Sequence, residues 1–406
     1  MTAAGSLLTA RARIRALHGD LAAAAKNDLG FPNATDLDLG PVLAVMDWPL
    51  NNVGYPGQPA RGFRGHTLEL EWEVVHLVAD LFRAPTDDRT GLVTSGSTAA
   101  IAHALLHARD RFGDVMLYAS TAAHTCVRKV AHHLRIPFTA VPARAGGEID
   151  YAELSAAVTR RPRGAVPVVV ATIGTTMQEA IDDVRLIREA LDAAGVPREA
   201  RHVHADGALS GLALAGLDPV QRPAFDFADG ADSINVSGHK FLGVPEPCGV
   251  LVMRRSACAS MNDTVTYTGA ADLTMAGSRS GHTPLMVWWA LQTFGPDGLR
   301  RRAETSRALA RQAVDLLTAA GVPASRHELA FTVVLPRPGE AFLERWPLAI
   351  EGDWAHFVCM PGKTLSDVRR FVDDYVAAMA VPSSKSNSII HTSAGRPDDS
   401  EAAIAC

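Results

Sequence analysis

One lysine and one aspartate stand at a spacing that could support cofactor chemistry. The lysine closes the motif Ser237–Lys240, and the aspartate closes His204–Asp206, 34 residues earlier. A lysine amine can form an imine with an aldehyde, and a carboxylate can hold a ring nitrogen in its protonated form. These are the two protein groups that pyridoxal 5'-phosphate (PLP) chemistry needs most. The pair is a candidate PLP site, although a lone lysine after a histidine is more often a solvated side chain.

The elements around this pair alternate between short apolar runs and longer helical stretches. The apolar runs are typical of strands buried on both faces and cover residues 114–119, 166–171, 202–205, 233–236 and 250–253. Helical stretches rich in Ala, Leu and Arg lie between them, at residues 99–111, 126–134 and 184–194. This alternation predicts an α/β fold with a mostly parallel sheet and helices on both of its faces.

Candidate functional residues directly follow three of the expected strands. Asp206 follows the strand at 202, Lys240 follows the strand at 233, and the turn Gly174–Thr176 follows the strand at 166. Open parallel sheets bind their ligands beyond the carboxyl ends of the strands. The sequence therefore predicts that these residues meet at one edge of the sheet.

A turn of small and hydroxyl residues, Thr94–Thr98, precedes the helix expected from Ala99. Small residues let backbone N–H groups approach an anion, and a helix N-terminus adds a favourable dipole. A plain helix N-cap is the alternative interpretation, but the position of the turn ahead of the aspartate and the lysine favours a phosphate site. The chain has no G-x-G-x-x-G or Walker-type lysine loop, which removes the main support for dinucleotide or nucleoside triphosphate binding.

Composition and charge limit the possible partners. The 406 residues are 47% hydrophobic and carry a net charge of −5, so neither nucleic acid nor an anionic membrane is expected as a partner. No apolar run is long enough to span a bilayer, and no secretory signal is evident. Five cysteines without C-x-x-C spacing argue against a disulfide framework and a zinc site, so we expect a cytoplasmic protein without a metal. The basic run 300–302, with Arg307 and Arg311, predicts a solvated helix face.

Several further motifs accompany the lysine and the aspartate. They are HADGALSG at 204–211, SGHK at 237–240, PCG at 247–249, GSRSGHTPL at 277–285, IGTT at 173–176 with AIDD at 180–183, GEID at 147–150 and GDWAH at 352–356. Together they resemble the motifs of the group II PLP-dependent amino acid decarboxylases of fold type I, and within them the bacterial PLP-dependent histidine decarboxylases. The likeness runs from about residue 28 to about residue 380.

The resemblance implies a fold and a division into domains. A fold type I large domain with a mostly parallel seven-stranded sheet is expected at residues 61–295. An N-terminal helical and extended segment would precede it at 1–60, and a small C-terminal α+β domain would follow at 296–380. The composition of residues 381–406 predicts a disordered tail.

The resemblance also implies roles for individual residues. Lys240 would bind the cofactor aldehyde and move protons at the substrate α-carbon, Asp206 would bond the pyridine nitrogen, and His124 would stack on the ring beside the substrate. Asn52 would contact the substrate, and Ser278 would reach the cofactor phosphate of a neighbouring subunit in a homodimer with shared active sites. The other expected cofactor contacts are Ala208 on the opposite ring face, Thr176 near the phenolic oxygen or the substrate carboxylate, and Gly96, Ser97, Thr98, Ser237 and His239 at the phosphate.

The activity implied by the resemblance is decarboxylation of an L-amino acid to its amine and carbon dioxide, with histidine as the leading substrate. The loop Ser95–Ile101 departs from the family's Gly-Gly-Thr-Glu-Gly-Asn, and Leu329–Phe331 is more apolar than the family segment. A decarboxylase of a more apolar amino acid therefore stays open. So do a PLP enzyme of another reaction type (aldol cleavage, transamination or condensation) and a catalytically silent relative, because the same lysine and aspartate would serve each of them.

Overall fold

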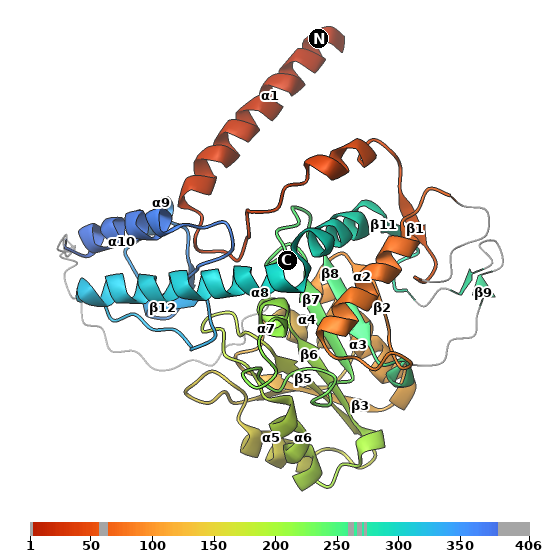
Figure 1. Cartoon of the computed structure of the whole chain (residues 1–406). Helices are drawn as coiled ribbons and strands as arrows, with labels where there is room; N and C mark the ends of the chain where they lie inside the picture. The colour runs from red at the N-terminus through yellow and green to blue at the C-terminus, as the bar shows by residue number, and fades with distance from the viewer. Residues whose placement is uncertain (1–2, 57–63, 259–263, 266–269, 272–273, 381–406) are drawn as a thin grey trace, which may run out of the picture.

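The computed structural model describes residues 3–56, 64–258, 264–265, 270–271 and 274–380. A large α/β part is built on a seven-stranded sheet, and a smaller part on a three-stranded sheet lies beside it (Figure 1). The predicted disordered tail, 381–406, falls outside the described residues. Within the described part of the chain, no helix combines the length and the apolar character needed to cross a membrane.

The large sheet has the strand order β2-β8-β7-β6-β5-β3-β4. Its strands are β2 (Thr90–Thr94), β3 (Val115–Ser120), β4 (Phe138–Val141), β5 (Val166–Thr172), β6 (His202–Asp206), β7 (Ser233–Ser237) and β8 (Gly249–Met253). Only β8 runs antiparallel to its neighbours β7 and β2. The mostly parallel, seven-stranded sheet is thus confirmed, and so are the five strands expected from apolar runs.

Two strands of this sheet were not expected from the sequence. In β4 only the last residue, Val141, is buried, because the strand lies at the edge of the sheet. The other strand, β2, is short and contains Gly91, a residue that weakens a strand pattern. Neither strand therefore carries the continuous apolar run that marks the central strands.

Helices cover both faces of the large sheet, as the alternation of elements predicts. They are α2 (Leu68–Leu81), α3 (Ser97–Phe112), α4 (Cys126–Leu134), α5 (Tyr151–Thr159), α6 (Val184–Ala193) and α7 (Gly211–Ala215). On one face, Ile101 of α3 and Val127 of α4 pack in a cluster with Val170 of β5. On the other face, Leu154 of α5 packs in a cluster with Val169, the preceding residue of the same strand. Successive strand residues point to opposite faces, so a strand covered on both sides must be apolar throughout.

The smaller part follows the long helix α8 (His282–Ala319), which is broken at Gly295, where φ is 56°. It contains β12 (Thr332–Pro336), α9 (Glu340–Arg345), β13 (Ala349–Glu351), β14 (Trp354–Val358) and α10 (Leu365–Ala380), and its antiparallel sheet has the order β12-β14-β13. The break in α8 falls at the expected boundary after residue 295. The division into domains as a whole stays a prediction.

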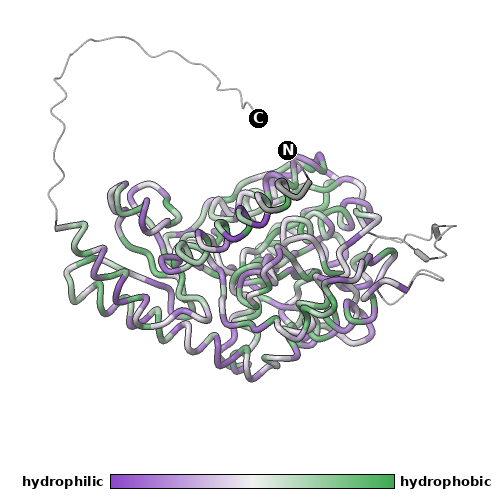
Figure 2. Tube along the Cα trace, turned by 90° about the horizontal axis from the view of Figure 1, so that it is seen from above, coloured by the Kyte–Doolittle hydropathy of each residue, from purple (hydrophilic) through white to green (hydrophobic). Residues whose placement is uncertain are grey.

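The remaining elements lie around these two parts. The N-terminal helix α1 (Ala3–Ala24) projects away from the rest of the chain (Figure 1). The short strand β1 (Asn51–Val53) pairs with β11 (Ser278–Ser280), and β9 (Thr264–Val265) pairs with β10 (Ala270–Ala271). In the outer helices of Figure 2, hydrophilic and hydrophobic residues are interspersed along the length of each helix, as expected for helices with one buried face.

At two of its five arginines the basic run in α8 corrects the expected solvated helix face, whereas Arg300, Arg301 and Arg311 are exposed, as expected. Arg302 is buried, donates to both carboxylate oxygens of Asp36 at 2.7 and 2.5 Å, and lies 3.8 Å above the ring of Phe294. Arg307 is also buried and donates to the backbone carbonyl of Leu329 at 2.8 Å. Charge alternation along a helix does not reveal which arginines find a buried partner, because those partners come from distant segments.

Candidate active site

A cavity of about 810 Å³ lies at the carboxyl ends of the parallel strands. The last residues of β5, β6 and β7, which are Thr172, Asp206 and Ser237, line its wall. The predicted site residues that line it are Gly96, Ser97, Thr98, His124, Thr176, Asp206, Ala208, Ser237, His239 and Lys240. The structure thus brings together side chains that are up to 144 residues apart, at the edge where the strand pattern placed them.

Asp206 is fixed at the end of β6 with one carboxylate oxygen engaged. Its Oδ1 accepts hydrogen bonds from Nδ2 of Asn235 at 2.9 Å and from the backbone N–H of Ala208 at 3.2 Å. The described residues donate no hydrogen bond to Oδ2. A 5% exposed carboxylate with one free oxygen can bind a protonated ring nitrogen.

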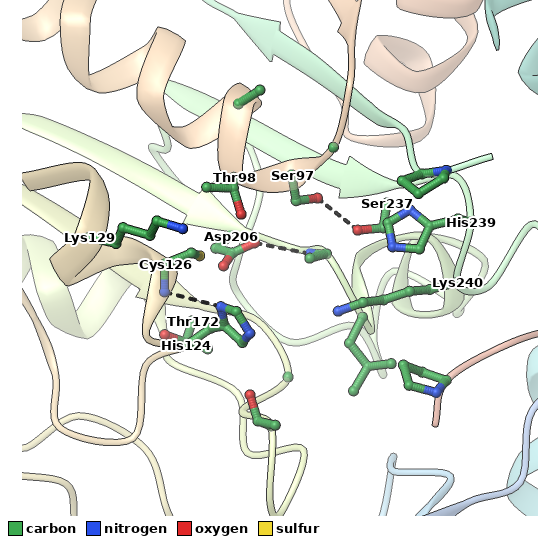
Figure 3. Close-up of a pocket in the computed structure, with 18 of the residues that line it drawn as sticks. Ser97, Thr98, His124, Cys126, Lys129, Thr172, Asp206, Ser237, His239 and Lys240 are labelled. Carbon is green, nitrogen blue, oxygen red and sulfur yellow. Dashed lines mark hydrogen bonds between the residues drawn. The ribbon is translucent and has the colours of Figure 1, made fainter. Parts of the chain in front are cut away.

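Lys240 follows β7, and its amine points into the middle of the residues that line the cavity (Figure 3). Burial lowers the pKa of its ammonium group, and the negative charge of Asp206 partly opposes this shift. A lowered pKa increases the fraction of neutral amine at neutral pH, and the neutral amine is the form that attacks an aldehyde.

The N-terminus of α3 offers a site for an anion, with Ser97 and Thr98 above Asp206 in Figure 3. The Oγ atoms of Ser97 and Ser237 are 2.8 Å apart, and Gly96, which precedes the helix, has a φ of 151°. The backbone N–H groups of the first helical turn have no acceptor within the helix and can bind an anion. Gly249 of β8 keeps this turn close, since a Cβ at that position would come within 2.8 Å of the Gly96 carbonyl carbon.

Two of the four histidines in the cavity lining have backbone partners at Nδ1. Nδ1 of His124 accepts from the backbone N–H of Cys126 at 3.2 Å, so Nε2 of the neutral ring carries the proton and can donate to a ligand. Nδ1 of His239 lies 3.1 Å from both the backbone N–H and the backbone carbonyl oxygen of Cys248, so either tautomer finds a partner there. Burial, followed by the charge of Lys240, lowers the pKa of His124, which favours the neutral ring.

Helix α4 supplies site residues that the sequence did not reveal. Cys126, Lys129, Val130 and His133 line the cavity from one side of the helix. Burial raises the pKa of the Cys126 thiol to about 11, so the thiol stays neutral. Lys129, Val130 and His133 follow Cys126, the first residue of the expected helix, by three, four and seven positions. Residues at this spacing share one side of a helix, and this is the sequence signal that could have identified them.

Two predicted site residues lie elsewhere. Asn52 is fully buried outside the cavity, where Nδ2 donates to Glu71 at 2.7 Å and Oδ1 accepts from the backbone N–H of Thr67 at 2.8 Å. Its amide joins β1 to α2 and does not line this cavity, and the expected contact with substrate stays a prediction. Ser278 is exposed, lies 3.1 Å from Nδ2 of Asn51 and lines a neighbouring cavity of about 360 Å³.

A buried glutamate joins the loop after β5 to the smaller part of the molecule. Glu179 is 1% exposed and has a left-handed φ of 57°. Its carboxylate accepts from the hydroxyl of Ser210 at 2.8 Å, from the backbone N–H groups of Phe331 and Thr332 at 3.0 and 2.9 Å, and from the Thr332 hydroxyl at 2.7 Å. Burial raises its pKa, and these hydrogen bonds oppose the shift. Because Thr176 lies on the same loop, Glu179 also sets the position of a cavity residue.

We expect Glu179→Ala to lower the free energy of unfolding by about 3–5 kcal/mol, because it strands several buried donors at once. Glu179→Gln is the matched control: its amide oxygen can replace the oxygen that accepts three of the four bonds. Urea denaturation of both variants measures the difference. Equal stabilities of the two variants would contradict this role.

The buried imidazole of His356 in β14 should make the free energy of unfolding depend on pH. It lines the cavity at 3% exposure, and burial lowers its pKa from 6.5 to about 4, opposed by a hydrogen bond to the backbone of Met177. The unfolded chain therefore binds a proton that the folded chain does not, so stability is present above pH 6.5 and is lost as the pH falls towards 4. Between pH 7 and pH 5 this loss is about 2 kcal/mol. Urea denaturation at both pH values should show His356→Gln losing less stability than the unchanged protein by that amount; equal losses would refute the assignment.

The donor set of the cavity fits PLP. It offers a buried amine, a carboxylate with one free oxygen, and a helix N-terminus with two serine hydroxyls, at the carboxyl edge of an α/β sheet. Fold and site together define a PLP-dependent enzyme of fold type I.

Comparisons with known proteins agree with this class and narrow it. The family model described as "Pyridoxal-dependent decarboxylase conserved domain" matches residues 64–335. Histidine decarboxylase of Pseudomonas entomophila is 37% identical over 86% of this chain and 86% of its own length, and that of Mesorhizobium japonicum is 39% identical over 83% and 89%. The chain belongs to the group II pyridoxal-dependent decarboxylases and is a PLP-dependent amino acid decarboxylase.

Solved structures show the same fold. L-methionine decarboxylase from Streptomyces sp. 590 superimposes with a TM-score of 0.81 at 24% identity, covering 90% of this chain and 95% of that protein. A sphingosine-1-phosphate lyase from Burkholderia pseudomallei gives a TM-score of 0.75 at 20% identity, covering 93% of this chain and 91% of that protein. At these identities the likeness concerns the fold.

Proposed function

We propose that the protein converts L-histidine to histamine and carbon dioxide. The observation that carries this proposal is the convergence of Lys240, Asp206 and His124 in one cavity of a chain that is 37% identical to a histidine decarboxylase over 86% of its length. The roles of the individual residues are part of the same proposal.

Bound PLP supplies an electron sink for the electron pair that remains when the bond to the carboxylate breaks. Asp206 keeps the ring nitrogen protonated, which makes that sink effective. His124, in the lining of the same cavity, would pack against the ring and orient it beside the substrate. Lys240 first holds the cofactor and afterwards returns a proton to the substrate α-carbon.

The charges of the cavity favour an uncharged substrate side chain. Its described lining contains two lysines, while Asp206 is its single carboxylate, and burial lowers the pKa of the lining histidines His124, His239 and His356, which favours their neutral form. A protonated imidazole would therefore meet repulsion, and we infer that histidine binds with its ring neutral. Helix α4 offers Lys129 and His133 as polar contacts for that ring.

A more apolar amino acid is the second candidate substrate, because part of the cavity wall is apolar. Phe31 and Pro32 from the N-terminal segment, Leu134 from α4, Met275 and Val358 line it together. These side chains would accept an aliphatic substrate as readily as the edge of an imidazole ring.

The proposal is tested by incubating the PLP-loaded protein with each of the twenty amino acids and identifying released amines by mass, with carbon dioxide measured in parallel. We expect histamine and an equal amount of carbon dioxide. If another amine is released together with carbon dioxide, the amino acid from which that amine derives is the substrate instead of histidine. A product without carbon dioxide would indicate aldol cleavage, transamination or condensation instead.

We also propose a cytoplasmic homodimer with shared active sites. Ser278 is exposed and lies in the motif that resembles the segment reaching a neighbouring cofactor, and the four described cysteines are free, as in a reducing compartment. Analytical ultracentrifugation should give twice the mass of the chain. A monomer with full activity would refute the shared sites.

A further inference from the structure

A row of buried polar side chains lies behind Asp206 on two neighbouring strands. His202, His204 and Asp206 alternate along β6, and Ser233 and Asn235 alternate along β7, with His204 opposite Ser233 and Asp206 opposite Asn235 in the register. Side chains two residues apart share one face of a sheet. All five are at most 5% exposed.

These side chains form one continuous hydrogen-bonded chain. Nε2 of His202 and Nδ1 of His204 each lie 2.8 Å from Oγ of Ser233. Nε2 of His204 lies 2.7 Å from Oδ1 of Asn235, whose Nδ2 donates to Oδ1 of Asp206 at 2.9 Å. The carboxylate is therefore linked to a histidine four residues earlier in the same strand.

The direction of every bond in this chain follows from the carboxylate. An ionised carboxylate only accepts, so Asn235 must donate through its amide nitrogen and accept through its oxygen. His204 must then donate from Nε2 and accept at Nδ1 from the hydroxyl of Ser233. The oxygen of Ser233 is left to accept from Nε2 of His202, and Nδ1 of His202 finds no hydrogen-bond partner among the described residues. Each donor thus points towards Asp206.

The histidines are held neutral, as this assignment requires. Burial lowers the pKa of His202 to about 3 and that of His204 to about 4, although Asp206 opposes the shift of His204. A neutral imidazole donates from one nitrogen and accepts at the other, so each histidine allows the hydrogen bonds on its two sides to point in the same direction.

We propose that His202, Ser233, His204 and Asn235 are positioning residues that orient Asp206 and strengthen its hold on the protonated pyridine nitrogen. Aligned hydrogen bonds polarise one another and stabilise the negative charge at their end. They also fix Oδ1 and leave Oδ2 free for the cofactor. The inference rests on the proposed role of Asp206 and extends it to residues that do not touch the cofactor.

The test compares the binding of two ligands by the full-length apo-protein in equilibrium dialysis. One ligand is PLP, and the other is the PLP analogue in which C–H replaces the ring nitrogen. Asn235→Leu should weaken PLP binding about tenfold, as expected for a lost hydrogen bond to a charged group. The affinity for the analogue should change less than about twofold, because it has no nitrogen for Asp206 to bind.

Variants at two further positions, 233 and 204, test whether the effect propagates along the hydrogen-bonded chain. Ser233→Ala, at a position three hydrogen bonds from Asp206, should weaken PLP binding about two- to threefold and leave binding of the analogue unaffected. His204→Phe should behave like Asn235→Leu, and His204→Gln should restore part of the loss, because glutamine can both donate and accept. If Asn235→Leu does not fold, Ser233→Ala and Asn235→Ser carry the test.

Ser237→Ala is the matched control, since it lies on the same strand and face but at the phosphate cradle. This variant should weaken the binding of PLP and of the analogue by the same factor. Equal weakening of both ligands by Asn235→Leu and Ser233→Ala would overturn the inference and leave the chain as a support for strand pairing. Equal affinity of the unchanged protein for the two ligands would reject the role of Asp206 itself, and the inference would fall with it.

Discussion

Replacement of Lys240 by alanine is expected to lower amine formation by about a thousandfold or more, because one residue both holds the cofactor and returns the proton. Its amine lies in the cavity with a lowered pKa, and alanine supplies neither the nucleophile nor a proton donor. Turnover of histidine by the variant, measured as released carbon dioxide, gives the size of the loss. A variant within about tenfold of the unchanged protein would contradict the assignment.

The second lysine of the cavity provides a matched control for this prediction. Lys129 of α4 lines the same wall and is exposed to it. Borohydride reduction of the PLP-loaded protein, followed by peptide mapping, should label Lys240 and not Lys129. The label should persist at Lys240 in Lys129→Ala and be lost in Lys240→Ala. A label found at Lys129 in the unchanged protein would reverse the roles of the two residues.

Asp206→Asn is expected to lower kcat by about 10²–10³-fold, a loss typical of removing one preorganised electrostatic contact. The amide keeps the size of the side chain, and its oxygen can still accept from Asn235 and Ala208. Its Nδ2, however, would present N–H groups to the ring nitrogen and favour the unprotonated ring. The loss should therefore fall on kcat more than on KM.

Asp206→Glu controls for charge, since it keeps the carboxylate and moves it by one methylene. Its kcat should lie between those of Asp206→Asn and the unchanged protein. Unfolding of the apo-variants in urea separates a catalytic loss from a loss of stability, because Asp206→Asn preserves the accepted hydrogen bonds. A kcat for Asp206→Asn within about threefold of the unchanged value would remove Asp206 from the proposed mechanism.

The repeating pattern of the chain was sufficient for the central part of the fold. Val166–Thr172 and Gly249–Met253 are continuous runs of apolar or small residues, because a strand covered on both faces must be apolar throughout. The role of Asp183 could also be predicted from the sequence, because its side chain accepts hydrogen bonds from the nearby N–H groups of Arg185 and Leu186 and caps the N-terminus of α6. Edge strands such as Phe138–Val141 are half exposed, and their pattern is correspondingly weak.

The site residues also divide into those that the sequence pattern could place and those that it could not. Lys240, Asp206 and the turn at Ser97 lie directly after strands or before a helix, and strand order alone brings such positions to one edge of a sheet. Asn52 and Glu179 could not be placed in this manner. Their partners, Glu71 for one and Thr332 for the other, come from separate segments, and only packing decides which polar group a buried side chain meets.

The sequence by itself determined the α/β class, the chemistry of one lysine and one carboxylate, and the edge of the sheet where they act, since these depend on local pattern and on the carboxyl ends of parallel strands. Only the tertiary structure decided that α4 lines the cavity, that Asn52 does not, and that His204 and Asn235 point their hydrogen bonds at Asp206. The physical reason is that hydrogen bonds between neighbouring strands depend on register, and the register is fixed by the packing of the whole sheet.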